Sequence, residues 1–148
     1  LFVERADNSA RLLDVKYFVL LPKPQYIGGN IDNMQWSILL RSLSSSRAFR
    51  WAYDGNITAT KIADFLVLNT NCPRSLSFCI QNIVKHLTNL KCSPKKVLKI
   101  YDTLKDLNIK IQEEKIDTIV EFGLHQFVSQ FINKISNVDR DIQKEFFN

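Results

Sequence analysis

The sequence predicts an all-α fold, a bundle of about six helices that forms one domain over residues 1–148. In most segments apolar side chains recur every three or four residues, as they do along the buried face of an amphipathic helix. The chain contains only four glycines and four prolines, which leaves room for long helices. No segment combines the strict alternation and the hairpin dipeptides that indicate paired strands. The core must therefore form by packing helix on helix.

Residues 1–21 are expected to form the first helix. It should end before Pro22 and Pro24, because proline lacks the amide hydrogen that continues a helix. At about 100° per residue, Ala6 and Leu13 fall on the same apolar side. We expect this side to face the core.

The same helix carries charged side chains on a second face. This charged stripe comprises Glu4, Asp7, Arg11 and Asp14, which helical spacing places within about 80° of one another. Apolar residues such as Leu12 flank the stripe, which is unusual for a freely solvated surface. We therefore expect another element to cover part of the charged stripe.

Two shorter helices are predicted next. The first of them spans residues 32–44, and Asp32 with a glutamine three residues later has the spacing of a capping box at its start. The other spans residues 47–53 and follows a run of serines. Trp36 and Trp51 are interpreted as core or interface anchors. The apolar face of the longer helix consists of Met34, Ile38, Leu39 and Leu43.

The middle of the chain is predicted to form two helices around a turn. The run "TATKIADFLVLN" favours a helix from Thr58, although "FLVL" alone is also compatible with a strand. The segment "NTNCPRS" predicts a turn in which Asn71 or Cys72 caps the next helix and Pro73 takes its first position. Apolar residues then recur at helical spacing as far as Leu90.

Two further helices complete the predicted bundle. Ser93 and Pro94 have the cap-then-proline pattern of a helix start, and that helix should run to about Leu107. Residues 116–147 show apolar side chains at helical intervals throughout. Gly123 lies inside this last segment and predicts a close crossing of two helices.

Several stretches resemble the blocks of one family of bacterial helical proteins. "VERADNSARLLDVKYFVLLP" is similar to the Glu-Arg signature of alpha-E domains, with Glu4 and Arg5 as the signature pair. "QWSILLRSL", "FLVLNTNCPRSLSFCI" and "GLHQFVSQFINKI" resemble further blocks of the family in the same order. Alpha-E proteins carry the domain as a tandem duplication, and this chain resembles the second, C-terminal copy. The resemblance therefore implies a longer protein whose first copy is missing here.

The same resemblance implies a biological setting but no reaction. Alpha-E genes are associated with circularly permuted ATP-grasp ligases, transglutaminase-like proteins and peptidases of the N-terminal-nucleophile type, which implies a system of peptide synthesis or modification. This chain departs from the family at one turn. Relatives tend to read "LDPD" where it has Leu68, Asn69, Thr70 and Asn71. An asparagine can still form the turn, but it supplies no carboxylate.

The first functional hypothesis is a non-catalytic interaction or accessory module. In this interpretation the charged stripe is a partly buried ion network that fixes the register of its helix, and such networks need every partner satisfied. The residues that would contact a partner or substrate are Glu4, Arg5, Arg11 and Asp14.

The alternative hypothesis makes the protein an enzyme of the same system. Glu4 and Asp7 would act as general base and acid, while Arg5 or Arg11 would bind a carboxylate or phosphate. His125 is a further catalytic candidate, although one histidine on a long helix is more often structural. We favour the module, since the sequence shows no nucleophile with an adjacent base and no phosphate loop.

Other functional classes fit the composition less well. The net charge of +5 comes from lysines interleaved with aspartates and glutamates, without an aromatic platform, so nucleic-acid binding is not expected. Cys72, Cys79 and Cys92 lack paired spacing, which predicts reduced thiols in a cytoplasmic protein, and we expect no metal site and no cofactor. No uncharged apolar run approaches the roughly 20 residues that span a bilayer.

Overall fold

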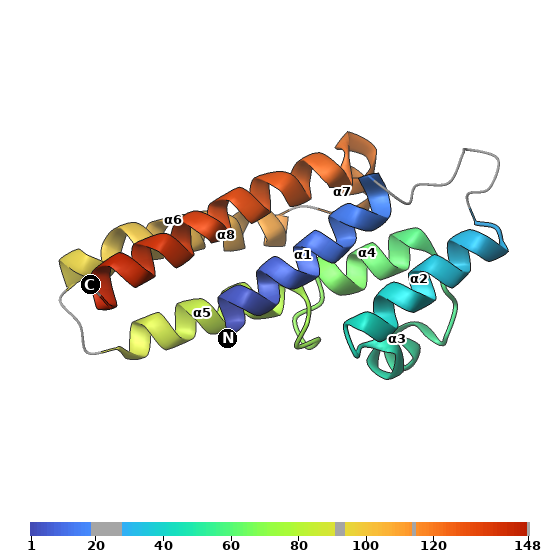
Figure 1. Ribbon diagram of the computed structural model, residues 1–148, viewed down its shortest axis with the longest axis horizontal. Helices are drawn as coiled ribbons and strands as arrows, with labels where there is room; N and C mark the ends of the chain where they lie inside the picture. The colour runs from blue at the N-terminus through green and yellow to red at the C-terminus, as the bar shows by residue number, and fades with distance from the viewer. Residues whose placement is uncertain (19–27, 91–93, 114, 148) are drawn as a thin grey trace.

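The structure, a computed structural model, describes residues 1–18, 28–90, 94–113 and 115–147 (Figure 1). This part of the chain contains eight helices and no strand. The helices are α1 (Phe2–Phe18), α2 (Asn30–Ser42), α3 (Ser46–Tyr53), α4 (Ala59–Val67), α5 (Leu76–Asn89), α6 (Pro94–Glu113), α7 (Ile116–Phe122) and α8 (Leu124–Phe146). The all-α class is confirmed, whereas the predicted number of about six helices is too low.

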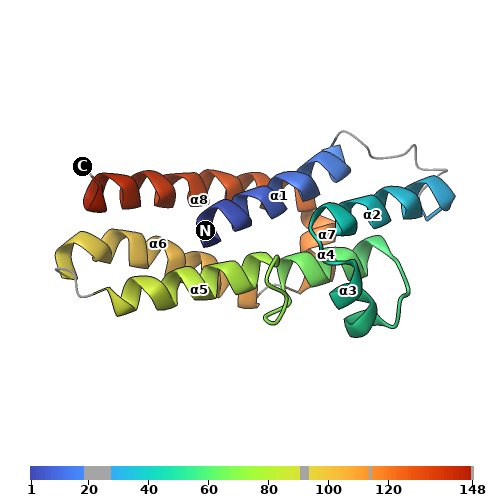
Figure 2. The same ribbon diagram turned by 60° about the horizontal axis from the view of Figure 1, so that its bottom comes forward.

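The helices form an elongated bundle (Figures 1 and 2). α1 packs against α8 and α5, and α6 packs against the same two helices, so these four helices enclose one core. α2 and α3 lie at the end of the molecule away from the C-terminus, with α2 against α1 and α3 against α2 and α4. α4 also contacts α7. α1 is thus in contact with both ends of the bundle.

Small side chains allow α1 to approach its neighbours closely. Ala6, Ala10 and Leu13 are fully buried, which confirms the predicted core face. Burying an aliphatic side chain of leucine size contributes about 1.5–3 kcal/mol, so this face anchors α1 firmly in the bundle. The predicted continuation of this helix to residue 21, and its end at Pro22, lie outside the described residues.

α4 is a capped helix, which settles the choice between helix and strand for this segment. Thr58 is its N-cap, and the Thr58 side chain accepts a hydrogen bond from the amide of Lys61 at 3.2 Å. Phe65, Leu66 and Val67 are all buried. Four consecutive apolar residues show no helical periodicity by themselves, which explains why "FLVL" alone is ambiguous.

α5 begins later than predicted. Its N-cap is Ser75, whose hydroxyl oxygen accepts a backbone hydrogen bond at 3.0 Å, so Pro73 precedes the helix and does not take its first position. Asn69 forms the preceding turn, where its Oδ1 accepts hydrogen bonds from the amides of Asn71 and Cys72, both at 2.8 Å. The caps predicted at Asn71 or Cys72 are wrong, while an asparagine does form the turn.

α6 starts at Pro94 as predicted but is longer than expected. The helix passes its predicted end at Leu107 and continues to Glu113. Ile111 is buried, so the apolar face continues beyond the predicted end. The cap predicted at Ser93 lies outside the described residues.

The helix predicted over residues 116–147 is interrupted at Gly123. This glycine has a φ of +108° and separates α7 from α8. A Cβ atom placed on it would meet nothing nearer than Cβ of Gln126 at 3.8 Å. Gly123 therefore provides a break in the backbone, and the predicted close helix crossing is wrong.

The start and the exposed face of α2 also differ from the prediction. Its N-cap is Gly29, and Asp32 is buried inside the first turn, so Asp32 does not cap this helix. The two leucines of the predicted apolar face are buried, whereas Met34 and Ile38 are 54% and 49% exposed. The apolar residues of α2 therefore divide between the core and the surface.

The two tryptophans have opposite environments. Trp36 on α2 is buried, so its interpretation as a core anchor is confirmed. α3 buries Phe49 and stacks Tyr53 on it, with ring centroids 5.1 Å apart. Trp51 lies on the other side of α3 and is 87% exposed. Of the two predicted roles, a core anchor is excluded for Trp51, and its role as an interface anchor stays a prediction.

Candidate functional site

The charged stripe of α1 faces α8. Glu4, Asp7 and Arg11 line one side of a cavity of about 190 Å³, and α8 lines the other side with residues that include Asp139. These α1 side chains share one wall because residues three and four positions apart lie on the same face of a helix. Asp7 and Asp14 are only partly exposed, so α8 covers part of the stripe as expected.

Within the charged stripe, Asp7 and Arg11 are paired with each other. Nε of Arg11 donates a hydrogen bond to Oδ2 of Asp7 at 2.7 Å, across one helical turn. This hydrogen bond and the charge of Asp7 raise the pKa of the Arg11 guanidinium. An exposed pair at this spacing stabilises a helix by only about 0.3–0.5 kcal/mol. The main effect of the pair is to hold Arg11 against its own helix.

Asp14 joins the charged stripe to the first turn of α8. Nδ1 of His125 lies 2.5 Å from Oδ1 of Asp14, and both side chains are accessible to solvent. The two residues are 111 positions apart in the sequence. A carboxylate that contacts Nδ1 fixes the orientation of an imidazole, an arrangement found in structural bridges and in general-base catalysis. The structure therefore brings His125, a sequence-predicted candidate, to one end of the stripe.

The two residues of the Glu-Arg pair have different neighbours. The Glu4 side chain is 84% exposed. Arg5 contacts the turn before α5, where its Nη1 donates a hydrogen bond to the carbonyl oxygen of Pro73 at 3.4 Å. The Arg5 guanidinium carbon also lies 5.3 Å from the centre of the Phe2 ring, within the range of a cation–π contact. Arg5 therefore lies apart from the charged stripe and links α1 to this turn.

The turn that Arg5 contacts lies beside two buried cysteines. Sγ of Cys79 is 3.7 Å from the Pro73 carbonyl oxygen. Burial raises the pKa of the Cys79 thiol to about 11 and shifts the pKa of the Cys72 thiol in the same direction. A thiol with a raised pKa stays protonated at neutral pH, so neither cysteine is an activated nucleophile.

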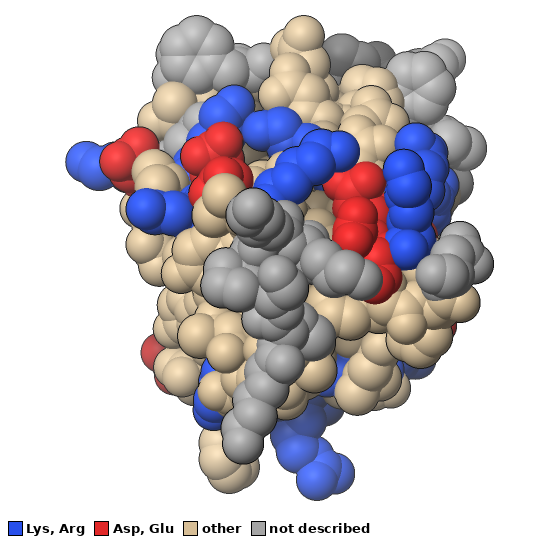
Figure 3. All heavy atoms as spheres, turned by 90° about the vertical axis from the view of Figure 1, so that its left-hand side faces the viewer, with Lys and Arg blue, Asp and Glu red and all other residues tan. Residues whose placement is uncertain are grey.

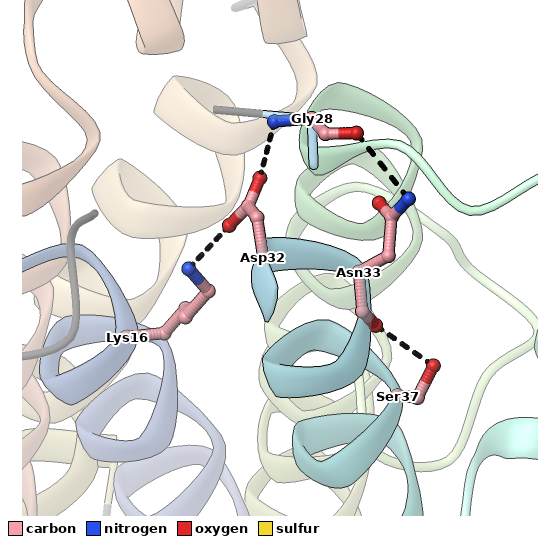
Figure 4. Close-up of polar contacts among 5 residues, drawn as sticks. All are labelled: Lys16, Gly28, Asp32, Asn33 and Ser37. Carbon is pink, nitrogen blue, oxygen red and sulfur yellow. Dashed lines mark hydrogen bonds and ion pairs between the residues drawn. The ribbon is translucent and has the colours of Figure 1, made fainter. Parts of the chain in front are cut away.

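A buried ion pair lies near the other end of α1, where no site is predicted from the sequence (Figure 4). Nζ of Lys16 donates a hydrogen bond to Oδ1 of Asp32 at 2.6 Å, and the two side chains are 2% and 6% exposed. The other carboxylate oxygen of Asp32 accepts a hydrogen bond from the amide of Gly28 at 2.9 Å. Nζ of Lys16 also lies 4.8 Å from the centre of the Trp36 ring. The pair joins α1 to the first turn of α2.

The environment of Asp32 keeps it charged. Burial by itself would raise its pKa, but the hydrogen bonds from Lys16 and from the Gly28 amide, with the charge of Lys16, lower the pKa below its usual value. Asp32 is therefore a carboxylate at neutral pH. One sequence signal was available, because Lys16 follows Leu13 by three residues and so lies at the edge of the apolar face. No comparable pattern in the sequence identifies Asp32, on α2, as the partner of Lys16.

Acidic and basic side chains are mixed on one face of the molecule (Figure 3). On the face shown in Figure 3, basic and acidic side chains lie next to one another. Between α6 and α8, Nζ of Lys99 lies 3.1 Å from Oδ2 of Asp141. A nucleic-acid backbone is bound by a continuous basic track, which is a different pattern.

The described residues contain neither a cluster of metal ligands nor a helix that could span a membrane. Over the described ranges, no group of three His, Cys, Asp or Glu side chains is placed to hold a metal ion. In that same part of the chain, no helix combines the length and the apolar character that crossing a bilayer requires.

These features define an all-helical domain with a Glu-Arg pair on its first helix. The family Alpha-E, described as a predicted alpha-helical domain with a conserved ER motif, matches residues 1–147. The chain belongs to the Alpha-E family. Glu4 and Arg5 are the only adjacent Glu and Arg in the sequence, so they are its ER motif. No curated protein and no solved structure matches the chain.

Proposed function

We propose that this Alpha-E domain is a non-catalytic interaction module whose ER motif serves both the fold and a partner. The observation that carries the proposal is the different orientation of the two motif residues. Arg5 contacts the Pro73 carbonyl inside the domain, whereas the Glu4 side chain is 84% exposed at the cavity that faces α8. The Arg5 guanidinium is bound to the protein's own backbone, whereas the Glu4 carboxylate is exposed. A motif built in this way can position its helix with one residue and present a negative charge to a partner with the other.

The arrangement of the charged stripe supports a module more than an active site. Asp7 and Arg11 form one ion pair, and Asp14 and His125 form another contact. Acid–base catalysis assisted by an arginine requires these groups to converge on one substrate. In this domain each of them contacts a protein neighbour, which supports a structural use.

The partners that we propose are the ATP-grasp ligases and transglutaminase-like proteins associated with the family. In this setting the domain acts in the cytoplasm, as the second copy of a duplicated protein, within a system of peptide synthesis or modification. The support is family membership together with the resemblance of the sequence blocks. Cys72 and Cys79 are buried thiols outside any disulfide, which suits a reducing compartment.

A second candidate function is an enzyme of the same system that uses the charged stripe. The contact between Asp14 and His125 favours it, because an aspartate that orients an imidazole is one component of general-base catalysis. Glu4 and Asp7 would then exchange protons with a substrate. The position of Arg5, apart from the stripe, counts against this function.

The substitution Glu4→Gln in the full-length protein distinguishes the two functions. If the domain is a module, the variant keeps its melting temperature, and less of the proposed ATP-grasp ligase partner co-purifies with it. If the domain is an enzyme, the variant keeps the complex and loses turnover by the assembled system. Glu113→Gln, at an exposed carboxylate of α6, is the matched control and should change neither measurement.

The substitution Arg5→Lys tests the structural half of the proposal. Lysine does not reproduce the planar fork of hydrogen-bond donors or the stacking of a guanidinium. We expect the free energy of unfolding to fall by about 1–2 kcal/mol, the size of a lost hydrogen bond and ring contact. An unchanged denaturation midpoint would show that Arg5 does not hold the fold.

A further inference from the structure

The junction of α2 and α3 exposes more positive than negative charge, with three arginines against the single carboxylate of Asp54 at the end of α3. Arg41, Arg47 and Arg50 are exposed there, and residues 28–57 contain no lysine. Within the described part of the chain, none of the three arginines forms an ion pair with a carboxylate. Nε of Arg50 donates only a long hydrogen bond, 3.5 Å, to the carbonyl oxygen of Ser46. These guanidinium groups are therefore available to an anionic ligand.

A hollow of about 350 Å³ opens between the two helices. Its lining includes the guanidinium-bearing Arg41 and Arg50, the hydroxyl-bearing Ser37 and Ser46, and the apolar Leu40 and Phe49. Leu40 and Phe49 are almost fully buried, so they form a rigid apolar floor. A guanidinium binds a carboxylate through two parallel hydrogen bonds, while the floor can accept an aliphatic or aromatic side chain. The hollow thus suits a ligand that is acidic and apolar at once.

Exposed apolar side chains lie next to the hollow on α2, and α3 exposes Trp51 about 100° around the helix from Arg50. On α2, Ile31, Met34 and Ile38 are exposed and lie within about 60° of one another around the helix, beside Arg41. On α3, Trp51 is 87% exposed, one turn after Arg47. Large exposed apolar residues next to arginine and tryptophan are typical of protein interfaces. We define the α2–α3 surface as Ile31, Met34, Ile38, Arg41, Arg47, Arg50 and Trp51.

We propose that the α2–α3 surface binds an acidic amphipathic segment of a partner protein. Carboxylates of that segment pair with Arg41 and Arg50, and its apolar side chains cover the floor of the hollow and the exposed stripe of α2. Charge complementarity selects this occupant. A nucleic acid would leave the apolar stripe of α2 uncovered and would need a longer basic track than three arginines supply. This surface is separate from the Glu4 site, so the inference goes beyond the proposed function.

A synthetic peptide tests the proposal on the full chain. The probe is a helix-forming peptide of roughly 16 residues, with leucines at three- and four-residue spacing, a few glutamates beside them and alanines elsewhere. We expect Arg41→Glu combined with Arg50→Glu to weaken its binding at least about tenfold in a titration followed by tryptophan fluorescence and calorimetry. Lys105→Glu combined with Lys110→Glu changes net charge equally on exposed positions of α6, and should alter the affinity less than about twofold.

Two further variants distinguish a loss of peptide binding at the α2–α3 surface from misfolding and from an effect of the Glu4 site. Trp51→Ala removes an exposed side chain, so it should weaken peptide binding while the melting temperature stays unchanged. Glu4→Gln should leave peptide binding unchanged, because Glu4 lies on another face. Equal losses in the two double-charge variants would overturn the proposal. Failure of the peptide to bind, equal binding of a version with glutamine for glutamate, or a preference for single-stranded DNA would overturn it as well.

Discussion

Nζ of Lys16 donates a hydrogen bond to Oδ1 of Asp32 at 2.6 Å, and this buried ion pair connects the end of α1 to the first turn of α2. The second oxygen of Asp32 is bound by the Gly28 amide, so both carboxylate oxygens have partners. A buried pair of this kind allows little freedom in how one helix is rotated against the other. With Asp32 facing inward, Met34 and Ile38 lie on the outer side of α2. The ion pair thereby sets which residues of α2 are exposed.

Removing one partner of this ion pair should be strongly destabilising. Asp32→Ala leaves the buried charge of Lys16 without a counter-ion, and we expect a loss of about 3–5 kcal/mol in the free energy of unfolding. Lys16→Met combined with Asp32→Leu replaces both charges by apolar groups and should cost less than Asp32→Ala alone. Urea denaturation followed by circular dichroism measures both. A loss no larger than that of Asp106→Ala, at an exposed position on α6, would contradict the prediction.

The same carboxylate should make stability depend on acid. The pKa of Asp32 in the folded protein lies below its ordinary value of 3.8, so the unfolded chain takes up the proton first as the pH falls. The contribution of the carboxylate to stability is therefore complete above about pH 4 and is lost as the pH falls through the folded pKa. Urea unfolding at a series of pH values should show that the difference in free energy of unfolding between the unaltered protein and Asp32→Asn becomes smaller as the pH falls. Two parallel curves would show that Asp32 is not responsible.

Helices were predictable where the signal is local. The apolar spacing around Leu76 to Leu90 and along residues 124–146 identifies helices because each buried face repeats within a few turns. The ends of the helices were harder to predict, because several nearby residues could each cap or end a helix. Ser75, and not Asn71 or Cys72, caps α5, and Gly123 ends α7 through a positive φ that its sequence context does not reveal.

The candidate site was predictable as a face but not as a set of contacts. Periodicity places Glu4, Asp7 and Arg11 on one side of α1, and the structure agrees. It cannot state which helix will cover that side, so the contact with His125 was not predicted. The pairing of Lys16 with Asp32 was missed for the same reason. The two residues lie on different helices, and the periodicity of one helix gives no information about which residue of another helix it contacts.

The break at Gly123 gives a prediction about backbone strain. Its φ of +108° is unfavourable for any residue with a Cβ atom, although space for that atom is available. We expect Gly123→Ala to lower the free energy of unfolding by about 1–3 kcal/mol. Asn137→Ala, at an exposed position inside α8, should change it by less than about 0.5 kcal/mol. Equal stabilities for the two variants would show that the break tolerates a side chain.

The buried thiols give a prediction about reactivity. In a Cys92→Ser background, Cys72 and Cys79 should react with iodoacetamide only when the domain opens, because both are buried and burial raises the pKa of each thiol. Labelling at about pH 8, followed by mass spectrometry, should be at least about a hundredfold slower in the native protein than in urea. Rapid labelling of either cysteine in the native protein would show an accessible thiolate. Such a result would restore a cysteine nucleophile beside the turn that Arg5 contacts, and with it the case for catalysis.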